Sequence, residues 1–103
     1  MDVPTFVSAD PRQVGQLPTR VQAALKSVMK ARLEADPFAG DRIRRDLWPK
    51  QFRGLGNLFR IELPEAHRAV YTVLTFPGRP REVRIVWLGN HKKYDRLFGY
   101  STS

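Results

Sequence analysis

The sequence contains no cysteine, no Gly/Ser-rich tract and no apolar run near the ~18 residues that a membrane helix needs. The absence of cysteine excludes disulfides, thiolate nucleophiles and thiolate-bound metals, and it agrees with a reducing compartment. Without a long apolar run or an apolar N-terminal segment, we predict neither a membrane span nor a signal peptide. We therefore expect a cytoplasmic protein with no membrane partner.

Several well-known catalytic motifs are also missing. The chain has no Walker loop, no dinucleotide fingerprint and no Ser/His/Asp order, and no two carboxylates are spaced for paired acid–base chemistry. These absences argue against nucleotide hydrolysis, redox chemistry and glycoside cleavage. Only His67 and His91 remain as nitrogen ligands, and they form no metal-binding pattern. We predict no metal site and no small-molecule cofactor.

Negative charge is scarce relative to positive charge. The 18 lysines and arginines outnumber the 10 aspartates and glutamates, which gives a net charge of +8. Residues 1–39 hold five basic and four acidic side chains, whereas residues 40–103 hold thirteen and six, so most of the excess lies in the later part. A field of this sign attracts nucleic acid first and an acidic protein second. The alternative is a basic surface without a binding role.

The apolar residues present are sufficient for one hydrophobic core, and we predict a single domain over residues 1–103. Residues 3–8 resemble a short edge strand, and Asp10-Pro11 is typical of the start of a short helix. Apolar residues at helical spacing predict a longer helix over 19–36, with Thr19 and Gln22 as a capping box. Residues 37–57 are predicted to be an irregular loop that is rich in arginine and aromatic residues.

The second half of the chain shows the alternation of strands. This alternation predicts strands over 58–63, 68–76 and 81–89, joined by turns. After them we expect a short helix over 92–98. The strand at 81–89 is apolar on both faces in its second half and is expected at the centre of the sheet. The expected fold class is α+β, with N-terminal helices packed on an antiparallel sheet of three to four strands and a short C-terminal helix. The other sheet face is expected to be partly open.

Basic side chains are expected together on that open face. Arg60 and Glu62 alternate with buried strand residues, and Arg68 begins the next strand across a turn. His91 leaves the end of the third predicted strand. Arginine stabilises charge that develops on a phosphate, and histidine exchanges protons near neutral pH, so this set is typical of phosphodiester cleavage. Each residue also has a structural alternative: Arg60 in a surface ion pair, His91 as a helix cap, and Tyr94 as a core ring.

The run FRGLGNLFRIELPEAHRAVYTVLTFPGRPREVRIVWLGNHKKYDRLF, residues 52–98, resembles the RelE/ParE toxin superfamily. The shared pattern is L-x-G, then an aromatic residue followed by R-I, then R-x-x-Y, then a hydrophobic strand that leads to G-x-H-x-x-Y. The resemblance implies a toxin of a type II toxin-antitoxin system, with N-terminal helices over a curved antiparallel sheet and an acidic or amphipathic antitoxin as its partner. RelE-like members cleave mRNA without a metal, commonly in the ribosomal A site, whereas ParE-like members inhibit DNA gyrase.

By position, the resemblance assigns catalytic roles to four residues: Arg60, Arg68, His91 and Tyr94. Glu62 departs from the pattern, because RelE has a lysine there, and this carboxylate either acts as a base or pairs with a neighbouring arginine. The basic residues predicted to contact RNA are Arg44, Arg45, Lys50, Arg53, Lys92 and Lys93. Trp48 and Phe52 either stack on RNA bases or pack in the core.

The leading hypothesis is a metal-independent endoribonuclease toxin that acts on mRNA. The ribose 2′-oxygen would attack the adjacent phosphate, with the arginines stabilising charge, His91 as acid or base and Tyr94 orienting the substrate. One alternative is a ParE-like toxin that inhibits DNA gyrase by binding. Another is a degenerate toxin that retains only antitoxin binding.

Overall fold

The structure is a computed structural model, and it describes residues 4–99. Its strands are β1 (Thr5–Ser8), β2 (Asp41–Arg42), β3 (Phe59–Leu63), β4 (His67–Leu74) and β5 (Arg81–Asn90). Its α-helices are α1 (Pro11–Gly15), α2 (Thr19–Val28) and α3 (His91–Phe98). A π-helical turn at Met29–Leu33 continues α2, and 3₁₀ turns lie at Arg45–Leu47 and Lys50–Phe52. The α+β class is confirmed.

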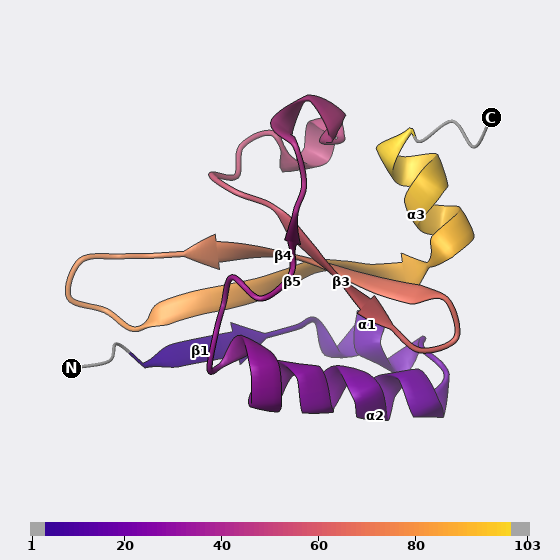
Figure 1. The fold of residues 1–103 in the computed structure, drawn as a ribbon, viewed down its shortest axis with the longest axis horizontal. Coiled ribbons are helices and arrows are strands. Elements are labelled where there is room, and N and C mark those ends of the chain that lie inside the picture. Colours follow the sequence, from indigo (N-terminus) through magenta and orange to yellow (C-terminus); the bar gives the residue numbers. More distant parts are fainter. Residues whose placement is uncertain (1–3, 100–103) are drawn as a thin grey trace.

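The five strands form one mixed sheet in the order β1-β5-β4-β3-β2 (Figure 1). β2, β3, β4 and β5 pair antiparallel, but β1 pairs parallel to β5, with Thr5 opposite Arg81. The prediction of a purely antiparallel sheet of three to four strands was therefore wrong. β1 lies at an edge, as its sequence indicated, whereas β4 and not β5 is the middle strand. β2 has only two residues, too few to show any alternation within the predicted loop.

α1 and α2 cover one face of the sheet (Figure 1). The stripe on α2 places Val21 and Leu25 in the core with no exposed surface, and Leu33 of the π-helical turn is buried equally. These side chains pack on the inward residues of β3, β4 and β5, which include Ile61, Tyr71 and Ile85. The spacing of apolar residues therefore predicted this layer correctly.

Two details of the helical segment differ from the prediction. The N-cap of α2 is Pro18, and no side chain caps this end. The Gln22 amide, expected in the capping box, instead donates to the Leu17 carbonyl at 2.8 Å. The predicted capping box at Thr19 was therefore wrong. Helical geometry ends at Leu33, three residues before Asp36, whose carboxylate accepts from the Phe38 N–H at 3.0 Å and so favours a turn.

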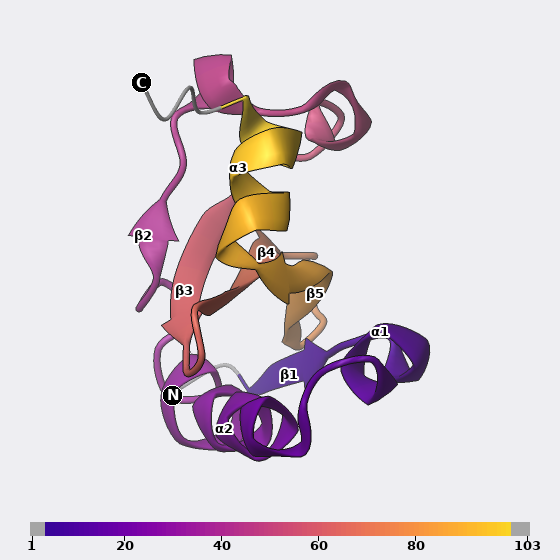
Figure 2. The same ribbon diagram turned by 90° about the vertical axis from the view of Figure 1, so that its right-hand side faces the viewer.

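The opposite face carries α3 and the segment of residues 43–58 (Figure 2). Their apolar side chains form a second core on the sheet, in which Phe52 stacks on Phe98 with ring centroids 6.2 Å apart. Trp48 and Phe52 are 4% and 6% exposed, so they are core residues rather than a surface on which RNA bases stack. The face expected to be partly open is therefore covered over part of its area.

One close contact joins the start of β2 to the middle of the sheet. The Gly40 N–H donates to the Tyr71 hydroxyl at 2.9 Å, and the Tyr71 ring stacks on Phe59 with centroids 5.4 Å apart. Tyr71 has no exposed surface. Burial raises its pKa above the ordinary value of 10.0, although the Gly40 hydrogen bond opposes this shift. The neutral phenol is thus part of the folded state.

This burial predicts a loss of stability at alkaline pH. Above pH 10.0 the Tyr71 phenol ionises in the unfolded chain but stays protonated in the folded one, so the unfolded state binds fewer protons. Titration of Tyr71 should therefore leave the free energy of unfolding unchanged below that pH and should lower it as the pH rises above it. Urea unfolding at pH 8–11, compared between wild type and Tyr71→Phe, measures the effect. Parallel pH dependences of the two proteins would contradict it.

Candidate functional site

β3 and β4 place a carboxylate and two arginines on the sheet face that α3 covers. Glu62 of β3 lies directly opposite Arg68 of β4, and Arg60 lies opposite Val70 of the second core. The Arg68 Nε donates to Glu62 Oε1 at 2.8 Å. The Arg68 side chain is only 11% exposed, whereas that of Glu62 is 56% exposed. Of the two uses foreseen for Glu62, pairing with a neighbouring arginine is the one seen.

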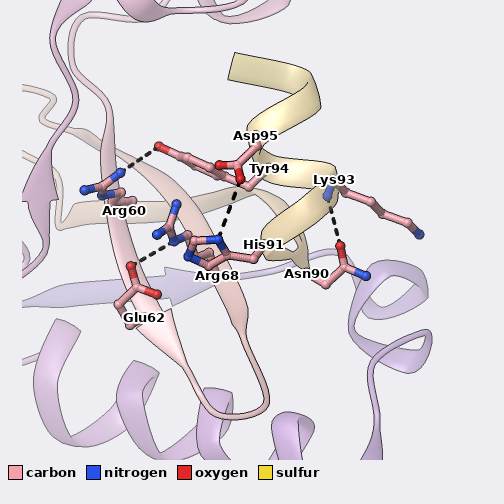
Figure 3. Close-up of polar contacts among 8 residues, drawn as sticks. All are labelled: Arg60, Glu62, Arg68, Asn90, His91, Lys93, Tyr94 and Asp95. Atoms are coloured by element: carbon pink, nitrogen blue, oxygen red, sulfur yellow. Dashed lines mark hydrogen bonds and ion pairs between the residues drawn. The ribbon is translucent and has the colours of Figure 1, made fainter. Parts of the chain in front are cut away.

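Tyr94 of α3 lies over these arginines (Figure 3). Its ring centroid is 4.5 Å from Arg68 Cζ, and its hydroxyl accepts a long hydrogen bond of 3.4 Å from the Arg60 Nη1. Tyr94 has no exposed surface and also packs on Trp87 and Phe98. The predicted role of orienting substrate by contact does not fit this burial. Tyr94 instead positions the guanidinium groups of Arg60 and Arg68.

Arg68 is held in a way that leaves one edge of its guanidinium unused. Glu62 binds Nε and the Tyr94 ring covers one face of the group. Within the described part of the chain, neither terminal nitrogen of Arg68 donates a hydrogen bond. A fixed guanidinium with two unused N–H groups on one edge matches the spacing of two oxygens on a phosphate.

His91 is the first residue of α3, three positions before Tyr94 and thus on the same side of the helix. Its N–H donates to the Ala66 carbonyl at 2.7 Å, which ties the start of α3 to the β3–β4 turn. The helix cap is Asn90, whose Oδ1 accepts from the Lys93 N–H at 2.9 Å, so the capping alternative for His91 is wrong. The structure thus brings Arg60, Arg68, Tyr94 and His91 to one region (Figure 3).

Asp95 belongs to this site and was missed in the sequence. Its Oδ2 lies 3.8 Å from His91 Nδ1, with side-chain exposures of 24% for Asp95 and 45% for His91. This separation is an ion-pair distance rather than a hydrogen bond, and His91 Nε2 has no hydrogen-bond partner among residues 4–99. The available signal was the spacing of four residues on a predicted helix, which places the two side chains on one face.

The turn beneath His91 has an unusual backbone. Glu65 and Ala66 have φ angles of 55° and 56°, a region that residues with a Cβ adopt rarely. The Ala66 carbonyl that accepts from His91 belongs to this turn. Backbone of this kind persists where surrounding contacts stabilise it, and it is often found at functional sites.

The residues predicted to contact RNA fall into two exposed groups. Arg44, Arg45, Lys50 and Arg53 lie on the 43–58 segment, and Lys92 and Lys93 lie on the first turn of α3. Arg44 pairs with Asp46 at 2.8 Å, and Arg45 lies over the Trp48 ring. The Lys93 side chain points away from the arginines of the site (Figure 3). Both groups are nevertheless on the side of the sheet that carries the site (Figures 1 and 2).

Comparison of the chain with protein-family models, with curated proteins and with solved structures finds no match. Among residues 4–99, no group of three or more His, Asp or Glu side chains is placed to hold a metal ion. No helix in the same range is long and apolar enough to cross a membrane.

Proposed function

We propose that the chain is the toxin of a type II toxin-antitoxin system and acts as a metal-independent endoribonuclease on mRNA in the cytoplasm, with the ribosome as a further partner. The observation that carries the proposal is the fixed Arg68 guanidinium, with its unused edge beside Arg60 and His91. The resemblance of residues 52–98 to RelE/ParE toxins supports it independently.

The proposed reaction is an internal transfer at one phosphodiester bond. The 2′-hydroxyl loses its proton to His91 Nε2, and its oxygen attacks the adjacent phosphorus. The bond from phosphorus to the 5′-oxygen breaks, and that oxygen takes up a proton from water. The products are a 2′,3′-cyclic phosphate and a 5′-hydroxyl end. Arg68 and Arg60 stabilise the charge that develops on the phosphate oxygens, and Asp95 stabilises the protonated imidazole.

His91→Ala tests this proposal. Loss of a general base is expected to slow cleavage of RNA by about 100-fold or more. His67→Ala is the matched control, because within residues 4–99 the hydrogen bond of His67 Nδ1 is to the Glu65 carbonyl in the nearby turn. The cleavage rate of this variant should stay within about twofold of wild type. The measurement is the rate of appearance of cyclic-phosphate ends on a labelled RNA, with and without ribosomes.

Other results would point elsewhere. Equal cleavage by His91→Ala and wild type would remove His91 from the mechanism. Growth inhibition without any RNA product, accompanied by loss of gyrase supercoiling activity, would favour the ParE-like alternative. Binding of an antitoxin without toxicity would favour the degenerate toxin.

The proposed antitoxin has a suitable surface on the opposite side of the sheet. A groove of about 500 Å³ lies between β1, α1 and α2, with Val14, Leu25 and Met29 among its apolar lining. Lys26 is its one charged lining residue within residues 4–99. Residues 11–33 contain five basic side chains and no acidic one. An acidic amphipathic segment complements both properties.

A further inference from the structure

Arg45 lies at the junction of two clefts on the 43–58 segment. One cleft, of about 220 Å³, is lined by Arg42, Ile43, Arg44, Arg45 and Trp48. The other is lined by Arg45, Asp46 and Arg53. Three other arginines and one aspartate therefore line the clefts around Arg45, and the aspartate is already paired with Arg44 at 2.8 Å. The excess of positive charge suits a phosphate-bearing ligand.

The Arg45 guanidinium is held in place although the residue is exposed. Its Cζ lies 4.5 Å from the centroid of the Trp48 ring, and its Nη2 donates to the Gly56 carbonyl at 3.2 Å. Trp48 is itself fixed, since its indole N–H donates to the Ile43 carbonyl at 2.9 Å and the ring is 4% exposed. A rigid planar cation thus lies on a buried aromatic ring, with its own side chain exposed to solvent.

We propose that Arg45 is the stacking platform for one base of single-stranded RNA, with Arg42, Arg44 and Arg53 contacting the flanking phosphates. Guanidinium planes stack on nucleobases as aromatic rings do, and an immobilised plane loses little entropy when it does so. Arg45, which lies over the Trp48 ring, thus takes the base-stacking role that the sequence suggested for Trp48. This inference deepens the proposed function and rests on it for the choice of RNA.

The position of the platform fits an RNA that also reaches the candidate cleavage site. The 43–58 segment and α3 stand on the same side of the sheet, and they are in contact through Phe52 and Phe98. A base held at Arg45 would lie on the same side of the sheet as a phosphate bound at Arg68. The platform would therefore affect binding of RNA without entering the bond-breaking step.

The test measures binding, so that it does not depend on cleavage. The probe is a fluorescent single-stranded RNA with 2′-O-methyl groups on every ribose, which removes the attacking hydroxyl, and its abasic counterpart serves as the second probe. Arg45→Lys keeps the charge but removes the plane, and Arg20→Lys, an exposed position on α2, is the matched control. Fluorescence anisotropy should show about tenfold weaker binding of the base-containing probe by Arg45→Lys, near the lower end for one stacked base.

Three further results are expected if the platform exists. Arg45→Lys and wild type should bind the abasic probe equally, the dependence of affinity on salt should be unchanged because the charge is retained, and Arg20→Lys should match wild type. In wild type, the NMR signal of the Arg45 Nε–H should shift on adding the base-containing probe but not the abasic one. This NMR measurement uses only the wild-type protein, so its result does not depend on whether a variant folds.

Equal affinity of wild type and Arg45→Lys for the base-containing probe would overturn the inference. So would an equal loss with both probes, since that would indicate a phosphate contact. Neither result would alter the rate of cyclic-phosphate formation by the wild-type protein. Conversely, base-dependent binding without any cleavage would leave the platform standing while the proposed nuclease activity fails.

Discussion

Arg68→Ala is expected to lower the rate of RNA cleavage by about 1,000-fold, the upper range for removing one group that stabilises charge in a transition state. The variant removes a guanidinium that is both bound by a carboxylate and covered by Tyr94. It also leaves the negative charge of Glu62 without its partner beside the phosphate. Arg68→Lys should recover little, because an ammonium group cannot present two parallel N–H donors.

Arg84→Ala is the matched control for this prediction. Arg84 is also a strand arginine with a 2.8 Å ion pair, to Glu82, but it is exposed and outside the site. Its removal should leave cleavage within about twofold of wild type. Single-turnover rates with saturating RNA make the comparison, and circular dichroism verifies folding. Equal losses in both arginine variants would contradict a specific role for Arg68.

Glu62 variants extend the same prediction. Glu62→Gln keeps an oxygen that can accept from Arg68 Nε, whereas Glu62→Ala keeps none. If Glu62 orients Arg68, the glutamine variant should retain most of the single-turnover rate and the alanine variant should lose about tenfold, the cost of one hydrogen bond to a charged group. If the carboxylate instead quenches the site, both variants should cleave faster than wild type.

Gly40→Ala is expected to destabilise the fold by about 2–4 kcal/mol, through overpacking and the loss of a partly buried hydrogen bond. A Cβ at this position would lie 2.6 Å from the Arg60 carbonyl oxygen and 2.7 Å from the Tyr71 hydroxyl. The first of these atoms is backbone of β3 and cannot turn away. The midpoint of urea unfolding measures the effect, which should also displace Arg60 and so reduce cleavage.

Gly54→Ala is the control, since a Cβ there meets nothing within 4 Å and the backbone φ is not positive. It should change stability by less than about 0.5 kcal/mol. Combining Gly40→Ala with Tyr71→Phe removes one of the two clashing atoms, and the double variant should be more stable than the sum of the single losses predicts. Strict additivity would contradict the proposed contact.

Much of the fold could be predicted because its signals are local. The alternation over residues 58–63 places Ile61 inward and Arg60 outward, and the two following strands are marked by apolar β-forming runs between turns. Helical spacing in the same way identified α2. The parallel pairing of β1 with β5 could not be predicted in this way, because Thr5 and Arg81 lie far apart in the sequence. Strand pairing over such a separation leaves no mark on either segment alone.

Part of the candidate site could also be predicted, because its signals are local in the sequence. Alternation placed Arg60 and Glu62 on one face, and the end of a strand placed His91 near them. The burial of Tyr94 and Trp48 depended on two segments that meet over the same face of the sheet, and the sequence allowed both a surface and a core position for each ring. Asp95 is the exception, because its spacing of four residues from His91 is a local signal that the sequence contains.

The sequence by itself determined the α+β class, the inward and outward faces of β3, and the basic character of the later two thirds of the chain. These properties follow from neighbours in the chain and from composition. Only the tertiary structure decided that Glu62 and Tyr94 together fix Arg68, that Asp95 faces His91, and that Arg45 rather than Trp48 is exposed. Each of these depends on distances between elements, which are set by how the helices and the loop pack on the sheet.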